Sequence, residues 1–77
     1  MSGQTVQYRV SFGKKDEAVE GPDDAALVVT VAVGDVALDP EVAFMSGKLK
    51  AEGNTGLLFE VLKSGAAADT LRRLASR

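Results

Sequence analysis

The fold is decided by the stretch Asp39-Pro40-Glu41-Val42-Ala43-Phe44-Met45-Ser46-Gly47-Lys48-Leu49-Lys50-Ala51-Glu52-Gly53-Asn54-Thr55-Gly56-Leu57-Leu58. Its first residues are typical of a helix start. Asp39 suits the cap position, Pro40 suits the first helical position, and Glu41 suits the positive end of the helix dipole. We therefore predict a short helix from Pro40 to Met45.

The rest of the stretch predicts a strand and a second helix. Residues 46 to 52 alternate in polarity, with Ser46, Lys48, Lys50 and Glu52 in water and Gly47, Leu49 and Ala51 facing inward. Gly53 breaks this strand, and Asn54 can cap a helix with an apolar stripe of Leu57, Leu58, Val61 and Leu62, widened by Phe59. Ser64 and Gly65 end that helix, and a last helix with a thinner apolar stripe follows.

The first half of the chain has the pattern of strands. Val6 to Phe12 alternate with period two, 17 to 20 suit a short edge strand, and Ala26 to Val33 suit a central strand because both faces are apolar. This order predicts an α+β fold, with a small antiparallel-dominated sheet of about four strands and two or three helices packed on one face. We expect residues 1–77 to form a single domain.

Composition narrows the classes of function. The 77 residues include no cysteine and no histidine, which removes the thiolate nucleophile and the usual proton shuttle. A net charge of -2 argues against nucleic-acid binding. The N-terminal residues 1–4 carry no secretory signal and no apolar run approaches the roughly 20 residues needed to span a bilayer, so we expect a cytoplasmic protein.

Two other candidate sites have simpler explanations. Ser46 and Lys48 could form a nucleophile and base, but no elbow or oxyanion motif frames them. Four aspartates might suggest a calcium loop, yet their spacing lacks the alternating ligands of an EF-hand, so turn and cap roles explain them better: Asp23, Asp24, Asp35 and Asp39. We therefore expect no enzymatic activity, no metal and no cofactor.

The stretch from Asp39 to Leu62, roughly a third of the chain, resembles the C-terminal signature of the sterol carrier protein type 2 family. In that family such a segment joins a sheet strand to helices that wall a lipid cavity. The resemblance rests on Asp39, Pro40, Ala43, Phe44, Met45, Gly47, Lys48, Leu49, Lys50, Gly53, Asn54, Gly56 and Leu57. It implies a sterol-carrier-protein-like domain over 1–77 that binds or transfers apolar lipids, such as fatty acids, acyl-CoA or sterol-like molecules, without catalysis.

The implied site is a cavity between sheet and helices. A hydrocarbon ligand gains affinity from apolar area removed from water, so large and flexible side chains should line it. The residues that fit are Phe44, Met45, Leu49, Leu57, Leu58, Val61 and Leu62. The alternative is that these residues form a packed core, which is the rule in protein interiors.

The chain also departs from the family. A leading helix before Val6 is missing, and only Gly34 to Leu38 join the central strand to the Asp39 helix, so we expect a shortened form. Its cavity would be small, completed by a second copy of the chain, or filled. The alternative function is therefore a protein-protein interaction module, in which the apolar helix face forms a homodimer or docks on a larger partner such as an enzyme.

Charged residues suggest two further contacts. The last helix carries Leu71, Leu74, Arg72, Arg73 and Arg77, which would suit transient contact with an anionic membrane surface. The arginines are better explained by their favourable interaction with the negative end of the helix dipole. Lys48 and Lys50 could meet a lipid head group, although alternating charges on a strand usually form a solvated face.

Overall fold

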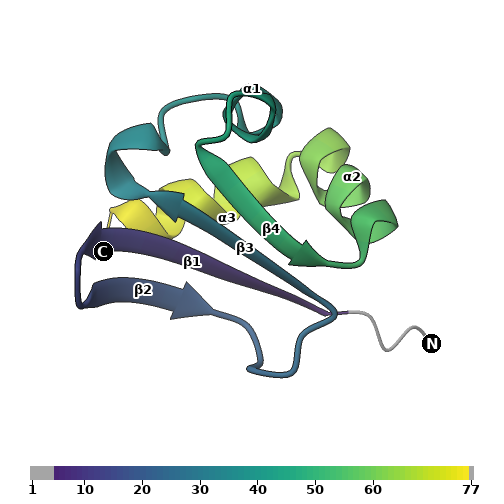
Figure 1. Cartoon of the computed structure of the whole chain (residues 1–77), viewed down its shortest axis with the longest axis horizontal. Helices are drawn as coiled ribbons and strands as arrows, with labels where there is room; N and C mark the ends of the chain where they lie inside the picture. Colours follow the sequence, from purple (N-terminus) through teal and green to yellow (C-terminus); the bar gives the residue numbers. More distant parts are fainter. Residues whose placement is uncertain (1–4, 77) are drawn as a thin grey trace.

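The computed structural model describes residues 5–76 and contains a four-stranded sheet in the order β2-β1-β3-β4 (Figure 1). The elements are, in chain order, β1 (Val6–Gly13), β2 (Asp16–Glu20), β3 (Leu27–Ala32), η1 (Val33–Asp35), α1 (Pro40–Met45), β4 (Leu49–Gly53), α2 (Thr55–Ser64) and α3 (Ala66–Ala75). Strand β1 runs antiparallel to β2, β3 runs antiparallel to β4, and the central pair β1–β3 is parallel. The predicted α+β fold with an antiparallel-dominated sheet is confirmed.

The alternation along the strands gives the sheet two different faces. Tyr8 of β1 lies opposite Val29 of β3, and Val29 lies opposite Ala51 of β4, so one face is a continuous apolar surface. The neighbouring row, Arg9, Thr30 and Lys50, belongs to the other face. Strand β3 is central as predicted, but only the face that carries Val29 contributes to the core.

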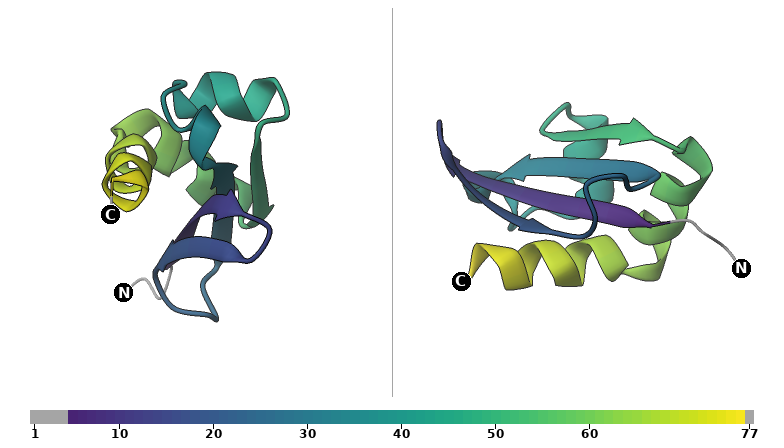
Figure 2. Two further views of the ribbon diagram at one scale, coloured as in Figure 1. Left: turned by 90° about the vertical axis from the view of Figure 1, so that its left-hand side faces the viewer. Right: turned by 90° about the horizontal axis from the view of Figure 1, so that it is seen from below.

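All three α-helices of the described chain pack toward the apolar face or its end (Figure 2). Helix α3 lies along β1 and β2, whereas α1 follows β3 and turns the chain back into β4. The buried apolar side chains form one cluster: Tyr8, Val10, Leu27, Val29, Val31, Ala43, Leu49, Leu58, Val61, Leu62, Ala67 and Leu71. The core is therefore the layer between sheet and helices.

Most predicted strand boundaries differ by one residue from those of the structure, and the start of the last strand differs by three. Val33 belongs to the 3₁₀ turn η1, and the last strand begins at Leu49 instead of Ser46. Ser46 ends α1 because its backbone N–H and its Oγ both donate to the carbonyl oxygen of Val42, at 2.9 and 2.8 Å. The Lys48 N–H then donates to Ala43, so residues 46–48 close the helix and cannot join the sheet.

The predicted helix starts are confirmed by their caps. The Asp39 carboxylate accepts a hydrogen bond of 3.0 Å from the Glu41 N–H, and Pro40 is the first residue of α1. The Asn54 side chain accepts one of 3.0 Å from the Leu57 N–H at the start of α2. Each cap satisfies an amide that has no partner within its helix, and so fixes where the helix begins.

Helix α3 is held to the sheet by its apolar stripe and by one ion pair. Leu71 is buried and Leu74 packs against the core, so the stripe faces the sheet. The guanidinium of Arg73 donates to both carboxylate oxygens of Glu20 on β2, each at 3.0 Å. Transient contact of this helix with a membrane surface stays a prediction. Arg77 and residues 1–4 lie outside the described residues. Within 5–76, no helix is long and apolar enough to cross a membrane.

Candidate functional site

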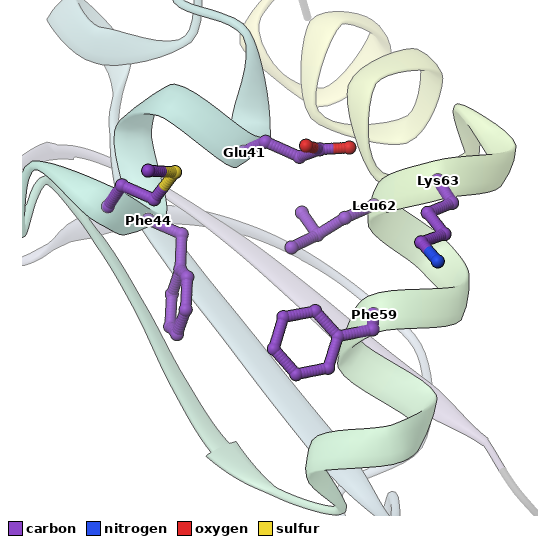
Figure 3. A pocket seen from close by; sticks show the side chains of 6 residues that line it. Glu41, Phe44, Phe59, Leu62 and Lys63 are labelled. Carbon is purple, nitrogen blue, oxygen red and sulfur yellow. The ribbon is translucent and has the colours of Figure 1, made fainter.

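A small apolar groove lies between α1 and α2 (Figure 3). Its volume is about 80 Å³, and it is lined by Glu41, Phe44, Met45, Phe59, Leu62 and Lys63. Helix α1 contributes the first three residues and α2 the last three. Two helices that are separate in sequence therefore form opposite walls of one site.

The aromatic side chains of the two walls meet across the groove. The rings of Phe44 and Phe59 are 6.4 Å apart between centroids and nearly perpendicular, at 89°. This edge-to-face arrangement is favourable for aromatic pairs because the positive ring edge meets the negative face. Leu62, one turn after Phe59, is buried and adds apolar surface between the walls (Figure 3). The pair fixes the spacing of α1 and α2 at this point.

Large apolar side chains are exposed around the groove. Met45 is 82% exposed, Val42 is 53% exposed and Phe59 is 47% exposed. Single exposed apolar residues are ordinary, and Val42 lies outside the groove lining, but Met45 and Phe59 both line the groove from opposite helices. We call Met45 and Phe59, with the groove between them, the groove face.

Two opposite charges border the groove face. Glu41 on α1 and Lys63 on α2 lie toward one end of the groove, and the two phenylalanine rings lie toward the other (Figure 3). Within residues 5–76 the side chains of Glu41 and Lys63 make no hydrogen bond and no ion pair. Both charges are thus available to a ligand or a partner.

The structure brings some of the predicted site residues together and separates others. Phe44, Met45 and Leu62 line the groove. Leu49, Leu58 and Val61 are buried members of the core, and Leu57 is partly buried against it. The space predicted as a cavity, between sheet and helices, is where these core side chains pack, and the groove lies instead between two helices.

Sequence reasoning left three groove residues out of the predicted site. Phe59 was assigned only to the margin of the α2 stripe, although its position three residues before Leu62 places both on one helix face. Glu41 was assigned to the helix dipole alone. Nothing in the sequence indicates that Lys63 belongs to a site, because a lysine in the last turn of a helix is ordinary.

The uncovered face of the sheet has a broad, shallow depression of about 340 Å³ lined by Arg9, Val28, Thr30, Lys50 and Glu52. Arg9 is held there by two contacts, since its Nε donates to Gln7 Oε1 at 2.7 Å and its Nη1 lies 3.3 Å from Glu17 Oε1. Lys48 and Lys50 are both exposed. The mixed charges of this face are those of a solvated sheet surface.

The remaining candidates have local structural roles. Ser46 caps α1 through Val42, and Asp39 caps its start, as described above. Asp23 accepts a hydrogen bond of 3.2 Å from the buried Gln7 side chain. In the described part of the chain, no three His, Cys, Asp or Glu residues are grouped in a way that could hold a metal ion.

Comparisons with known proteins bear on the fold. No protein-family model and no curated protein matches the sequence. The structure is similar to the solution structure of the sterol carrier protein domain 2 of Helicoverpa armigera, with a TM-score of 0.55 and 21% sequence identity. The similarity covers 97% of this chain and 71% of that chain. The chain therefore has an α+β fold like that of a sterol carrier protein domain, as the resemblance in sequence implied.

Proposed function

We propose that this protein binds an apolar lipid, such as a fatty acid, acyl-CoA or sterol-like molecule, reversibly and without catalysis in the groove between α1 and α2. The observation that carries the proposal is the groove itself, with apolar walls and exposed Met45 and Phe59 at its margin. The likeness to a sterol carrier protein domain supports the same class of ligand.

The size of the groove bears on how much ligand it holds. A volume of about 80 Å³ equals the liquid volume of roughly three water molecules. Complete small-molecule pockets are about 300 Å³ or larger. We therefore propose that the groove takes up a short length of hydrocarbon, with the rest of the ligand lying along the exposed side chains of the groove face.

The energy of such binding comes from area removed from water. At about 25 cal/mol per Å² of apolar surface, covering the exposed half of the Phe59 ring gives on the order of 1 to 2 kcal/mol. Removal of that ring should therefore weaken binding by about five- to thirtyfold. No acid, base or nucleophile is needed for this step.

The test compares two variants with similarly exposed apolar residues. Phe59→Ser removes an aromatic wall of the groove, whereas Val19→Ser removes a side chain that is 45% exposed on β2, away from the groove. Delipidated protein is titrated with a fluorescent fatty acid, and folding is checked by circular dichroism. We expect saturable binding to wild type and Val19→Ser, and weaker binding to Phe59→Ser. Absence of saturable binding to wild type, or equal affinities for all three proteins, would refute the proposal.

A further inference from the structure

We propose that two copies of this chain associate through the groove face, so that each copy covers the groove of the other. The association is a twofold-symmetric dimer, with the symmetry axis running along the groove. Its existence does not depend on lipid binding. Where the proposed lipid function also holds, the second copy supplies the missing wall of the site.

Exposure of the groove face is the first argument. Met45, Val42 and Phe59 are the three most exposed large apolar side chains in the described chain, and all belong to α1 or α2. Of these three, Met45 and Phe59 line the groove, and apolar surface exposed in this way typically marks an interface. Methionine is suited to such a contact because its flexible side chain adapts to the partner surface.

The charges of the groove face are complementary to themselves. A twofold axis along the groove places α1 of one copy over α2 of the other. Because Glu41 and Lys63 lie toward the same end of the groove, this rotation brings Glu41 opposite Lys63 of the second copy, and the reverse pair forms by symmetry (Figure 3). Two charges that are unpaired in one chain thus find partners in a dimer.

The same rotation completes the groove. It places the Phe44 and Phe59 end of each groove against the same end of the second copy, so apolar surface meets apolar surface. A typical stable interface covers about 800 Å² on each partner, which is roughly a sixth of the 4754 Å² exposed by this chain. A groove of about 80 Å³ that is open to solvent in one copy becomes an enclosed site between two.

The test is an exchange of charges. Sedimentation equilibrium of delipidated protein at low ionic strength measures the dimer dissociation constant for wild type, Glu41→Lys, Lys63→Glu and the double variant. Each single variant replaces two attractive pairs by two repulsive ones, so we expect it to raise the constant by about tenfold or more. The double variant restores both pairs and should return near the wild-type value. Lys14→Glu, in the turn between β1 and β2, is the control for net charge.

The outcomes separate this proposal from the lipid proposal. A wild-type protein that remains monomeric at all concentrations, or a double variant no better than the single ones, overturns the dimer even if fatty acid binds. A dimer with charge rescue supports the proposal even if the fatty-acid titration shows no binding. The exchanged residues are exposed, so the variants are expected to fold, and circular dichroism checks this because a lysine at position 41 opposes the dipole of α1.

Discussion

At the scale of single residues, Tyr8 shows how burial in this small core changes a side chain's chemistry. Burial raises the pKa of the Tyr8 hydroxyl above its ordinary value of 10.0, and the nearby Glu20 carboxylate raises it further. Both effects oppose the charged phenolate. Tyr8 is the one tyrosine of the chain, so its titration can be followed without overlap.

We predict that the ultraviolet absorbance of tyrosinate appears at a higher pH in the folded protein than in urea. The neutral phenol is favoured in the fold, so this contribution to stability is complete below the unfolded-state pKa near 10.0 and decreases as pH rises through the folded-state value. Glu20→Gln should lower the folded-state midpoint toward that of the urea-unfolded chain. Identical midpoints in folded and unfolded protein would contradict the burial of Tyr8.

At the scale of elements, the turn from β4 to α2 depends on a glycine. Gly53 has φ of +123°, a conformation that side chains other than glycine rarely adopt, and a Cβ there would collide with the carbonyl oxygen of Ala26. The same carbonyl accepts the Asn54 N–H at 3.0 Å, so the close approach ties β4 to the start of β3. The turn also sets where α2, and with it Phe59, begins.

We predict that Gly53→Ala lowers the free energy of unfolding by about 2 kcal/mol or more. The strained backbone conformation and the collision of the new Cβ with Ala26 both destabilise the fold. Gly13→Ala is the matched control, because a Cβ at Gly13 meets nothing within 4 Å. It should change stability by less than about 1 kcal/mol. Urea denaturation of both variants is the measurement, and equal effects would mean that the turn does not have the geometry described.

A second element, the six-residue helix α1, depends on its cap. Asp39→Ala removes the acceptor of the Glu41 N–H and should cost about 1 kcal/mol of stability. Because α1 carries Phe44 and Met45, fraying of its first turn should also weaken fatty-acid binding in the titration described above. Asp39→Asn, which keeps an acceptor at the same position, should retain most of both properties. Equal losses in the two variants would argue against the capping role.

At the scale of the whole molecule, one core carries the stability. A domain of this size is expected to be stable by only about 4 to 12 kcal/mol, so single core residues matter. Leu58 is 3% exposed between sheet and helices, whereas Met45 is largely exposed. We predict that Leu58→Ala lowers the free energy of unfolding by about 2 to 5 kcal/mol and Met45→Ala by less than about 0.5 kcal/mol. Urea denaturation is measured at protein concentrations at which the chain is monomeric, because the proposed dimer would bury Met45. A comparable loss from both variants under that condition would contradict the difference in burial.

The local elements could be predicted from the sequence. Alternating polarity predicted the strands, and caps at Asp39 and Asn54 predicted where α1 and α2 begin, because these signals depend on residues close in the chain. The sequence did not show that β1 and β3 pair in parallel, nor that Ser46 closes a helix instead of opening a strand. The parallel pairing depends on which distant segment supplies the hydrogen-bond partner. The partner of Ser46, Val42, is only four residues away, but alternating polarity does not distinguish a helix end from a strand start there.

Packing between distant segments separates the apolar residues that form the core from those that line the groove. Leu58 and Phe59 are neighbours in one apolar stripe of α2, yet Leu58 is buried beneath the helix and Phe59 contacts Phe44 of α1. Helical periodicity orders side chains around the axis. The rotation of that axis against the sheet, and the position of α1 beside it, follow from packing between segments far apart in sequence. For this reason the sequence could indicate apolar residues on these helices, but which of them line the groove between α1 and α2 required the fold.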